Sequence, residues 1–467
     1  MPPFAPQGKQ SAPSVRLEHA TKWPKLRRIV SEHGGMVNEA EHSAELAAYQ
    51  AQTARDFRWN FGVMVMDGAF FFLGINIAAP STIMPLYVRH FTDSALLIGL
   101  VSTIAGAGWY LPQLLTVNFT ERQPRKKVVA VNIGLFAERL PFLVMAASAF
   151  LLAARSPGLA LALFFLTLAW HTVGAGAIAV AWQEMLAKVI PVNYRGRMLG
   201  LASFIGTATG ALGASFAASI LDRYPFPSNF AICFGLTFAF VMGSWFFLAM
   251  VREPPLHSNK PQVSLLEYWR CLPMVLKGSP NFRAYLVARM MTVLGRMGLG
   301  FLTVYAVDRW GLSDSQAGIY TTLLLVGQSL SNVVFGPLAD RAGHKLVLET
   351  SLALAVLSMV VAILAPSPLW MYPVFAAVGA LTASDIVSGV NIALEFGQPS
   401  DRPTYIGLAN TLPGLTAAVA PLIGGWIASN SSYQATFFSA AVLNLAALAF
   451  LHWRVLEPRS SQAQAGQ

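Results

Sequence analysis

Charge is scarce in this sequence. Only 12% of its 467 residues are Asp, Glu, Lys or Arg, whereas 55% are hydrophobic and the mean hydropathy is +0.53. A soluble domain of this length needs about twice that share of charged residues to cover its surface. The composition therefore excludes an ordinary soluble globular protein and indicates an integral membrane protein.

Cysteine is also nearly absent. Cys233 and Cys271 fall in or near apolar segments on different sides of a span, so no disulfide is expected, and neither has metal-ligand spacing. The eight histidines are scattered without ligand spacing, and no loop carries Gly-x4-Gly-Lys-Ser/Thr. The sequence thus predicts no metal and no cofactor, and it favours neither an enzyme nor a nucleotide-driven pump.

No secretory signal segment is apparent either. The first apolar run begins near Asn60, after a polar and basic stretch without a hydrophobic core, so no cleavable signal peptide is expected. Residues 1–58 are interpreted as a cytoplasmic leader, disordered over 1–30 and helical over 39–58. That helix is either a solvated lead-in to the first span or a contact with the membrane surface.

Long apolar runs are what the sequence has in abundance. Twelve runs of about 20 residues or more, each long enough to cross a bilayer as a helix, are separated by turns or charged residues. They lie near 60–85, 94–118, 128–153, 158–183, 198–221, 229–251, 283–306, 315–338, 346–365, 369–394, 405–428 and 433–453. They predict an all-α membrane protein whose units are an N-terminal bundle over 59–251, a cytoplasmic linker over 252–282, a C-terminal bundle over 283–454 and a cytoplasmic tail over 455–467.

Basic residues concentrate on one side of these spans. The leader, every second loop and the tail hold most of the Lys and Arg, whereas only Arg89, Arg155, Arg223 and Arg309 fall on the other side. The positive-inside rule then places both termini in the cytoplasm of a plasma membrane, the inner membrane if the cell is bacterial. The net charge of +10 is explained by a face lying against anionic lipid and does not indicate nucleic acid.

A charged turn occurs once in each half. The turn Gly336-Pro-Leu-Ala-Asp340-Arg341-Ala-Gly343-His344-Lys345 follows the eighth span, and an imperfect copy, Asn118-Phe-Thr-Glu121-Arg122-Gln-Pro124-Arg125-Lys126, follows the second. A further pair of loops places Arg195 after the fourth span and Arg402 after the tenth. This repetition indicates a duplicated bundle, and many transporters build a central site between two such bundles.

The turn at Gly336 resembles the G-x-x-x-D-R-x-G-R-R/K signature of the major facilitator superfamily, and the other three loops fall where that family places its repeats. The resemblance implies two pseudo-symmetric six-helix bundles that work by alternating access. The copy after the second span departs from the signature, because Glu121 replaces the acid and Pro124 replaces a glycine. The fourth and fifth spans also lack the motifs of the drug/proton antiporters, which weakens an assignment to multidrug efflux.

The loop charges are expected to form a gate at the cytoplasmic rim that latches one bundle to the other. Glu184 and Glu395, at the inner ends of the fourth and tenth spans, are natural partners for nearby arginines. These arginines are Arg195 or Arg122 in the first half and Arg402 or Arg341 in the second. Exposed pairs contribute about 0–1 kcal/mol each, which is enough to bias two states of similar energy. Alternatively, the loop charges only set the topology.

Six ionisable residues fall inside spans, where a charge is unfavourable by a few kcal/mol, so they are functional candidates. They are Asp67, Glu138, Arg139, Arg289, Arg296 and Asp385. The balance of three acids and three bases favours internal pairs. One pair would join Asp67 to Arg139. Another would join Asp385 to Arg289 or Arg296.

The resemblance places spans 1, 4, 7 and 10 around a central cavity, and with them Asp67, His171, Arg289, Arg296 and Asp385. Because the two arginines of the seventh span are seven residues apart, they share one helix face, which could bind a carboxylate or phosphate unless aspartates neutralise both. Asp67 would carry a coupling proton, or stay ionised as the partner of an arginine. His171 is either a proton relay or a hydrogen bond between helices.

Together these features predict a secondary transporter for a small organic solute, with proton-coupled export of an amphipathic or anionic molecule favoured. The aromatic run Phe70–Phe72 offers an adaptable apolar surface, or simply faces lipid. The alternatives are an uptake permease for a sugar or organic acid, and a non-transporting receptor on the same fold. The expected partners are the solute, a coupling ion such as the proton, and the bilayer; a monomer is expected.

Overall fold

The computed structural model of the chain describes residues 39–121, 123–255, 276, 278–389, 391–396 and 402–458. Within these ranges the chain is helical, without strands, and twelve helices are long and apolar enough to cross a membrane. The predicted all-α membrane fold is confirmed. Most of the predicted leader, linker and tail lies outside the described residues.

The N-terminal bundle is built from long helices, one of which is interrupted by π-helical turns. Its elements are α2 (Glu39–Ile77), α3 (Ile83–Arg89), α4 (Ala95–Glu121), the π-helices η2 (Val129–Ile133) and η3 (Leu135–Arg139), α5 (Leu140–Leu152), α6 (Pro157–Val189), α7 (Val192–Arg223) and α8 (Ser228–Ala249).

The C-terminal bundle has the same plan with more interruptions. Its elements are α10 (Pro280–Leu294), the 3-10 turn η4 (Leu299–Phe301), α11 (Leu302–Trp310), α12 (Ser315–Ala342), α13 (His344–Leu364), the 3-10 turn η5 (Pro368–Trp370), α14 (Met371–Ser384), the π-helix η6 (Asp385–Gly389), the 3-10 turn η7 (Asn391–Glu395), α15 (Arg402–Asn430) and α16 (Tyr433–Arg454).

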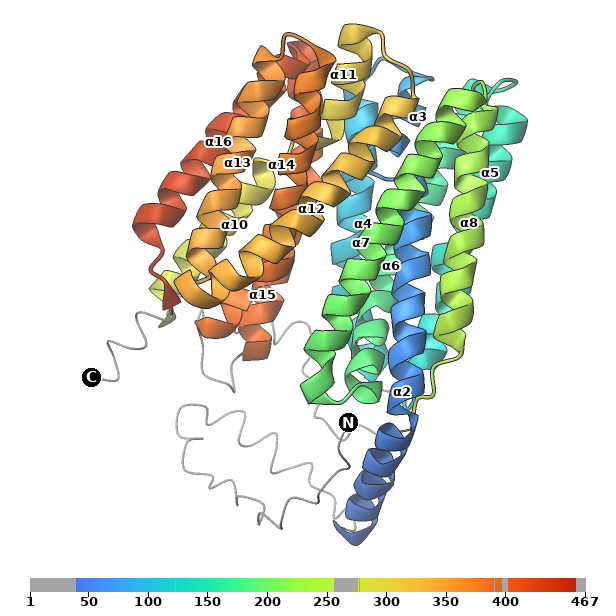
Figure 1. Cartoon of the computed structure of the whole chain (residues 1–467), viewed down its shortest axis with the longest axis vertical. Coiled ribbons are helices and arrows are strands. Elements are labelled where there is room, and N and C mark those ends of the chain that lie inside the picture. The colour runs from blue at the N-terminus through green and yellow to red at the C-terminus, as the bar shows by residue number, and fades with distance from the viewer. Residues whose placement is uncertain are drawn as a thin grey trace.

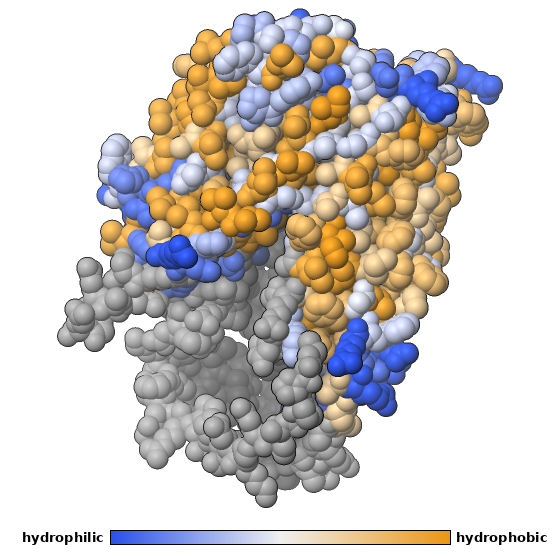
Figure 2. All heavy atoms as spheres, viewed as in Figure 1, coloured by the Kyte–Doolittle hydropathy of each residue, from blue (hydrophilic) through white to orange (hydrophobic). Residues whose placement is uncertain are grey.

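The two bundles stand side by side (Figure 1). α4 packs against α15 and α7 against α12, so these two helix pairs join the halves. α2 begins and α16 ends at the same end of the molecule, here called the inner end after the predicted orientation. The opposite end, where α3 and α11 lie, is called the outer end. The visible face is mostly apolar between polar patches near both ends, as a bilayer requires (Figure 2).

The bundles approach each other backbone to backbone at two glycines. A Cβ atom on Gly99 of α4 would lie 2.7 Å from the carbonyl oxygen of Pro421 in α15. A Cβ atom on Gly318 of α12 would lie 2.5 Å from the carbonyl oxygen of Ala214 in α7. Small residues therefore permit the contact between halves. The glycines of 206–213 instead pack on α2 within their own bundle.

The lead-in helix and the first span form one continuous helix, α2. We expected this span to continue to residue 85, but α2 ends at Ile77 because Pro80 lacks an amide donor, and α3 restarts the chain at Ile83. The lead-in part also contacts the N-terminal bundle. The hydroxyl of Tyr49 donates to the Lys188 carbonyl of α6 at 2.7 Å.

Polar contacts join the bundles at the outer end. Nε of Arg89 donates to Oδ2 of Asp308 at 2.9 Å, and this bond raises the pKa of Arg89. Nε2 of His90 lies 2.7 Å from Oδ2 of Asp314. The hydroxyls of Thr82 and Thr321 add a hydrogen bond between α12 and the turn before α3. The structure is therefore closed at its outer end.

Candidate functional site

Four of the six membrane charges lie where the helix is irregular. Glu138 and Arg139 end the π-helix η3, Asp385 opens the π-helix η6, and Arg296 lies in the break between α10 and η4. π-helical turns occur mostly at functional sites, and transporters bind their substrates at broken helices. The backbone therefore supports the choice of these residues as candidates.

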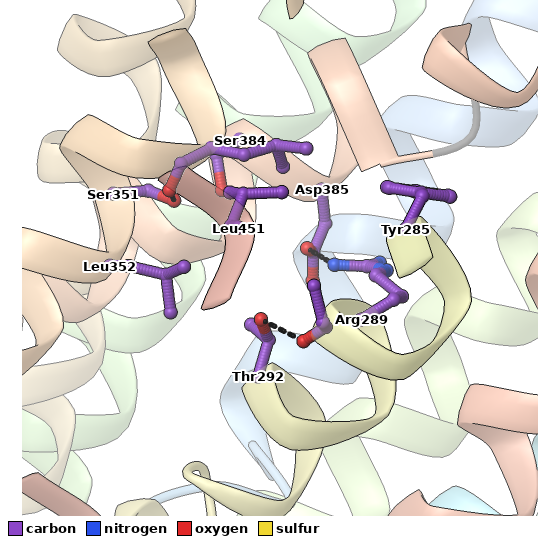
Figure 3. Close-up of a pocket in the computed structure, with 10 residues that line it drawn as sticks. Tyr285, Arg289, Thr292, Ser351, Leu352, Ser384, Asp385 and Leu451 are labelled. Atoms are coloured by element: carbon purple, nitrogen blue, oxygen red, sulfur yellow. Dashed lines mark hydrogen bonds and ion pairs between the residues drawn. The ribbon is translucent and has the colours of Figure 1, made fainter. Parts of the chain in front are cut away.

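Arg289 and Arg296 both pair with Asp385. Nη1 of Arg289 bonds to Oδ1 of the carboxylate and Nη1 of Arg296 to Oδ2. Figure 3 shows Arg289 of α10 and Asp385 pointing toward one another. We expected the two arginines to share one face of a continuous helix and Asp385 to pair with one of them. Instead, the helix breaks after Leu294, and both arginines contact Asp385.

This cluster of Arg289, Arg296 and Asp385 carries one net positive charge. Its side chains are 11%, 26% and 20% exposed, so the charge is largely removed from water. Neighbouring hydroxyls do not compensate it, because Thr292 and Ser384 each donate to a carbonyl of their own helix. Of the two alternatives, the described contacts favour the cationic face over one in which aspartates neutralise both arginines.

The guanidinium of Arg289 packs against the backbone at Gly389. A Cβ atom on Gly389 would lie 2.8 Å from Nη2 of Arg289, so a larger residue here would require the guanidinium to shift. The hydroxyl of Tyr285, also in α10, donates to the carbonyl of Gly389 and ties α10 to η6. The glycine and the tyrosine together fix the position of the arginine.

A cavity of about 270 Å³ lies beside the charged cluster, between the bundles. Its polar lining comes from both halves and consists of Ser81, Ser102, Tyr110, Arg289, Arg296, Asp385 and Asn410. The remaining lining is apolar or glycine. A mostly apolar cavity with a few converging polar groups is typical of a small-molecule site.

Three guanidinium nitrogens of the two arginines that line the cavity lack hydrogen-bond partners among the described residues. They are Nε of Arg289 and both Nε and Nη2 of Arg296, and all three are buried. Native structures leave few buried donors unsatisfied, so each of these donors is a candidate contact for a bound ligand. The two on Arg296 lie on the same edge of one planar group.

A second cluster, Asp67 with Glu138, Arg139 and His171, is buried inside the N-terminal bundle. We had expected Asp67 to pair with Arg139, but the described contacts of Asp67 do not include this arginine. Its carboxylate accepts hydrogen bonds from Nε1 of Trp182 at 3.1 Å and from Oγ of Ser244 at 2.6 Å.

Arg139 pairs instead with Glu138, its neighbour in the chain. Both residues are buried at the end of the π-helix η3, so the adjacent carboxylate is the nearest anion to the arginine. Nδ1 of His171 donates to the Glu138 carbonyl at 2.8 Å, a hydrogen bond between helices. The cluster has two acids and one arginine, and none of its members lines the cavity.

The described contacts of the predicted gate stay within one bundle. Nζ of Lys126 lies 3.3 Å from Oε2 of Glu184, which we had expected to pair with an arginine. In the other half, His344 lies 3.6 Å from Glu395. Arg122 and the side chains of Glu121, Arg195 and Arg402 lie outside the described residues.

The turn at Gly336 has an exposed charged part and a fixed glycine. Asp340 and Arg341 are exposed, and Lys345 lies 3.6 Å from Glu349 in the same bundle. Gly343 has φ of +89°, a conformation that favours glycine, and it ends α12 directly before α13. The glycine of the signature therefore makes the tight turn.

Two glutamates at the inner ends of the bundles were not predicted as functional residues from the sequence. The buried carboxylate of Glu253 accepts from the amides of Lys126 and Lys127 at 2.9 and 2.7 Å, and from Nζ of Lys188 at 2.7 Å. Glu457 accepts from the Lys345 amide at 2.9 Å. Each carboxylate thus caps the start of the third span of its bundle. The repeats Val251-Arg-Glu-Pro254 and Val455-Leu-Glu-Pro458 could have revealed them.

The family follows from a match over most of the sequence. The sequence model of the Major Facilitator Superfamily matches residues 66–285 and again 285–467. The chain belongs to the Major Facilitator Superfamily. The resemblance drawn from the repeated loops is thereby confirmed, and the protein is a multi-pass membrane transporter and not an enzyme.

Similar transporters cover the chain only in part. The niacin transporter NiaP of Acinetobacter baylyi is 25% identical over 30% of this chain, and an efflux pump of Gibberella fujikuroi is 29% identical over 39%. The matched stretches span 32% and 33% of those two proteins. The solved D-xylose-proton symporter has a TM-score of 0.66 at 17% identity, over 86% of this chain and 99% of that one, and shares the fold.

Proposed function

We propose that this transporter is a secondary active transporter that moves a small organic solute through the cavity between its bundles by alternating access. The observation that carries the proposal is the cavity itself, which is lined from both halves and bordered by Arg289, Asp385 and Arg296. At about 270 Å³ it is just below the usual range for drug-sized ligands of roughly 300–1,000 Å³. The size favours a small solute.

The contacts between the halves suit a motion that opens and closes. At the outer end, Arg89 with Asp308 and His90 with Asp314 are partly exposed pairs. Such pairs contribute about 0–1 kcal/mol each, so they can be exchanged for other contacts without a large barrier. Two states of similar energy are what alternating access requires.

Asp67 is the residue we propose for a coupling proton. Glu138 and Asp385 pair with arginines, whereas Asp67 accepts its hydrogen bonds, among the described residues, from the neutral donors Trp182 and Ser244. Protonating Asp67 therefore leaves no arginine without its partner. It also balances the N-terminal cluster, whose two acids otherwise exceed its one base.

Export is the direction we favour, supported by the efflux pump among the relatives. Uptake of a sugar or organic acid is the second candidate, supported by the fold shared with the D-xylose-proton symporter. The sign of an imposed pH gradient distinguishes the two in sealed vesicles, because a secondary transporter is reversible. Proton-coupled export exchanges solute for protons and predicts solute accumulation in vesicles with an acidic lumen, whereas proton-coupled uptake predicts accumulation in vesicles with an alkaline lumen.

The cavity is tested by filling it. Asn410 of α15 lines the cavity and is exposed there, so Asn410→Trp places a large ring in the solute path. Asn430→Trp, at the outer end of the same helix, is the matched control. In proteoliposomes screened with neutral, cationic and anionic organic solutes, we expect flux that Asn410→Trp abolishes and Asn430→Trp preserves. Equal flux in both variants would show that the cavity is not the path.

A further inference from the structure

We infer that the cavity recognises a small monocarboxylate with an apolar body, whose carboxylate binds the free edge of Arg296. The inference rests on the proposed transport function and names the class of its substrate. Three properties of the cavity lead to it: the geometry of the free donors, the net charge, and the chemistry of the remaining lining.

The free donors have the geometry that a carboxylate requires. Arg296 uses Nη1 for Asp385, and its Nε and Nη2 are buried without partners among the described residues. These two nitrogens point their N–H bonds in parallel from one edge of the guanidinium plane. That edge is the one that binds both oxygens of a carboxylate at once. A neutral ligand with one acceptor would leave a donor unsatisfied.

The charge of the cluster selects a single negative charge. Among the described residues, Arg289 and Arg296 face one carboxylate, that of Asp385, so one positive charge of this cluster is uncompensated. An uncompensated buried charge is unfavourable, and a monoanion would bring the cluster to two cations and two anions. A dianion, such as a phosphate monoester, would leave one negative charge in excess. A neutral solute would leave the positive charge in place.

The rest of the lining suits an apolar body. Beyond the charged cluster, the cavity is lined by aliphatic side chains, prolines and glycines, among them Val293, Met297, Leu299, Pro413 and Pro421. Tyr110 and Asn410 leave room for one or two additional polar contacts. Tyr110 belongs to α4 and Arg296 to the other bundle, so a carboxylate on the arginine extends its body toward the N-terminal half.

Matched acid and amide probes test this class. We propose calorimetric titration of the purified transporter with benzoate and benzamide, hexanoate and hexanamide, and phenyl phosphate. Each acid should bind more tightly than its amide, and phenyl phosphate should bind more weakly than benzoate. Arg296→Gln should weaken benzoate by about 10- to 100-fold, the value of hydrogen bonds to a charged group.

Two further variants separate recognition from folding. Arg296→Lys keeps the charge but lacks the parallel donors, so it should bind benzoate more weakly than the wild type and more tightly than Arg296→Gln. Arg309→Gln removes an arginine of the same bundle that contacts Tyr305 and Trp310 outside the cavity, and should bind benzoate as the wild type does. Thermal unfolding without ligand verifies that each variant is folded.

The result that overturns the inference differs from the one that overturns transport. Equal binding of acids and amides, or full benzoate affinity in Arg296→Gln, eliminates the monocarboxylate class. If a neutral or cationic solute then crosses proteoliposomes and Asn410→Trp stops it, the transport proposal stands without the class. If acids bind through Arg296 but no solute crosses, the recognition stands and the transport proposal fails.

Discussion

Asn60 and Asn281 make the same pair of hydrogen bonds in the two bundles. The amide side chain of Asn60 donates to the Arg252 carbonyl at 2.9 Å and accepts from the Arg252 amide at 2.8 Å. Asn281 makes the same two bonds with Leu456, both at 2.9 Å. In each bundle the first span thus holds the chain that leaves the last span, directly before the capping glutamate.

Removing this pair of hydrogen bonds, here called the asparagine clamp, should destabilise the two bundles unequally. Asn60 is fully buried, whereas the bonds of Asn281 are exposed to solvent. A buried amide and carbonyl left without partners are unfavourable by about 1–3 kcal/mol, and exposed ones can bind water instead. We therefore expect Asn60→Ala to lower the thermal unfolding temperature clearly and Asn281→Ala to lower it little. Equal shifts would mean that burial does not decide the strength of the clamp.

Glu253 should matter more than a comparable glutamate at the inner end. Its fully buried carboxylate binds two backbone amides and Lys188, so Glu253→Gln leaves a buried ammonium without its anion. We expect a loss of about 3–5 kcal/mol in the free energy of unfolding. Glu349→Gln is the control, because Glu349 pairs with Lys345 and with the exposed His452. Denaturant unfolding in the same detergent compares the two, and similar losses would contradict the expectation.

The outer pair should control access to the cavity. Arg89 and Asp308 link the bundles, and the hydrogen bond between them raises the pKa of Arg89, so the arginine stays charged throughout the range where the protein is handled. Arg89→Gln weakens this link, by about 0–1 kcal/mol for a partly exposed pair. Ser102→Cys, with both native cysteines replaced, should then react up to about fivefold faster with a membrane-impermeant maleimide added outside. An unchanged rate would exclude the pair as a determinant of closure.

Asp67 should couple transport to protons without binding the solute. It does not line the cavity, and Trp182 and Ser244 can still bond an amide in its place. Asp67→Asn should therefore abolish accumulation driven by a pH gradient while solute exchange without a gradient continues. Asp222→Asn, at an exposed position near the end of α7, is the control. Retained pH-driven accumulation in Asp67→Asn would remove its coupling role.

The sequence predicted the spans, the charged candidates and an arginine partner for Asp385, but not the partners of Asp67. Apolar runs identify membrane helices because hydrophobic length is a local property. Which cation meets Asp385 depends on the break after Leu294, and the neutral partners of Asp67 come from α6 and α8. Glu253 was missed because its role depends on a buried contact with the start of another span. Such contacts arise only when distant segments pack, so the repeat around Glu253 could mark the glutamate but not name its partners.

Asp385 should be replaceable, in part, by a bound carboxylate. Asp385→Asn leaves Arg289 and Arg296 close together without an anion, and losing one partner of a buried pair is unfavourable by about 3–5 kcal/mol. The variant should therefore unfold at a lower temperature than the wild type. A monocarboxylate that enters the cavity would supply the missing charge, so millimolar benzoate should raise the unfolding temperature of Asp385→Asn more than that of the wild type. Benzamide, with the same ring and no charge, should have no such effect, and equal stabilisation by the two probes would show that the arginines do not recognise the carboxylate.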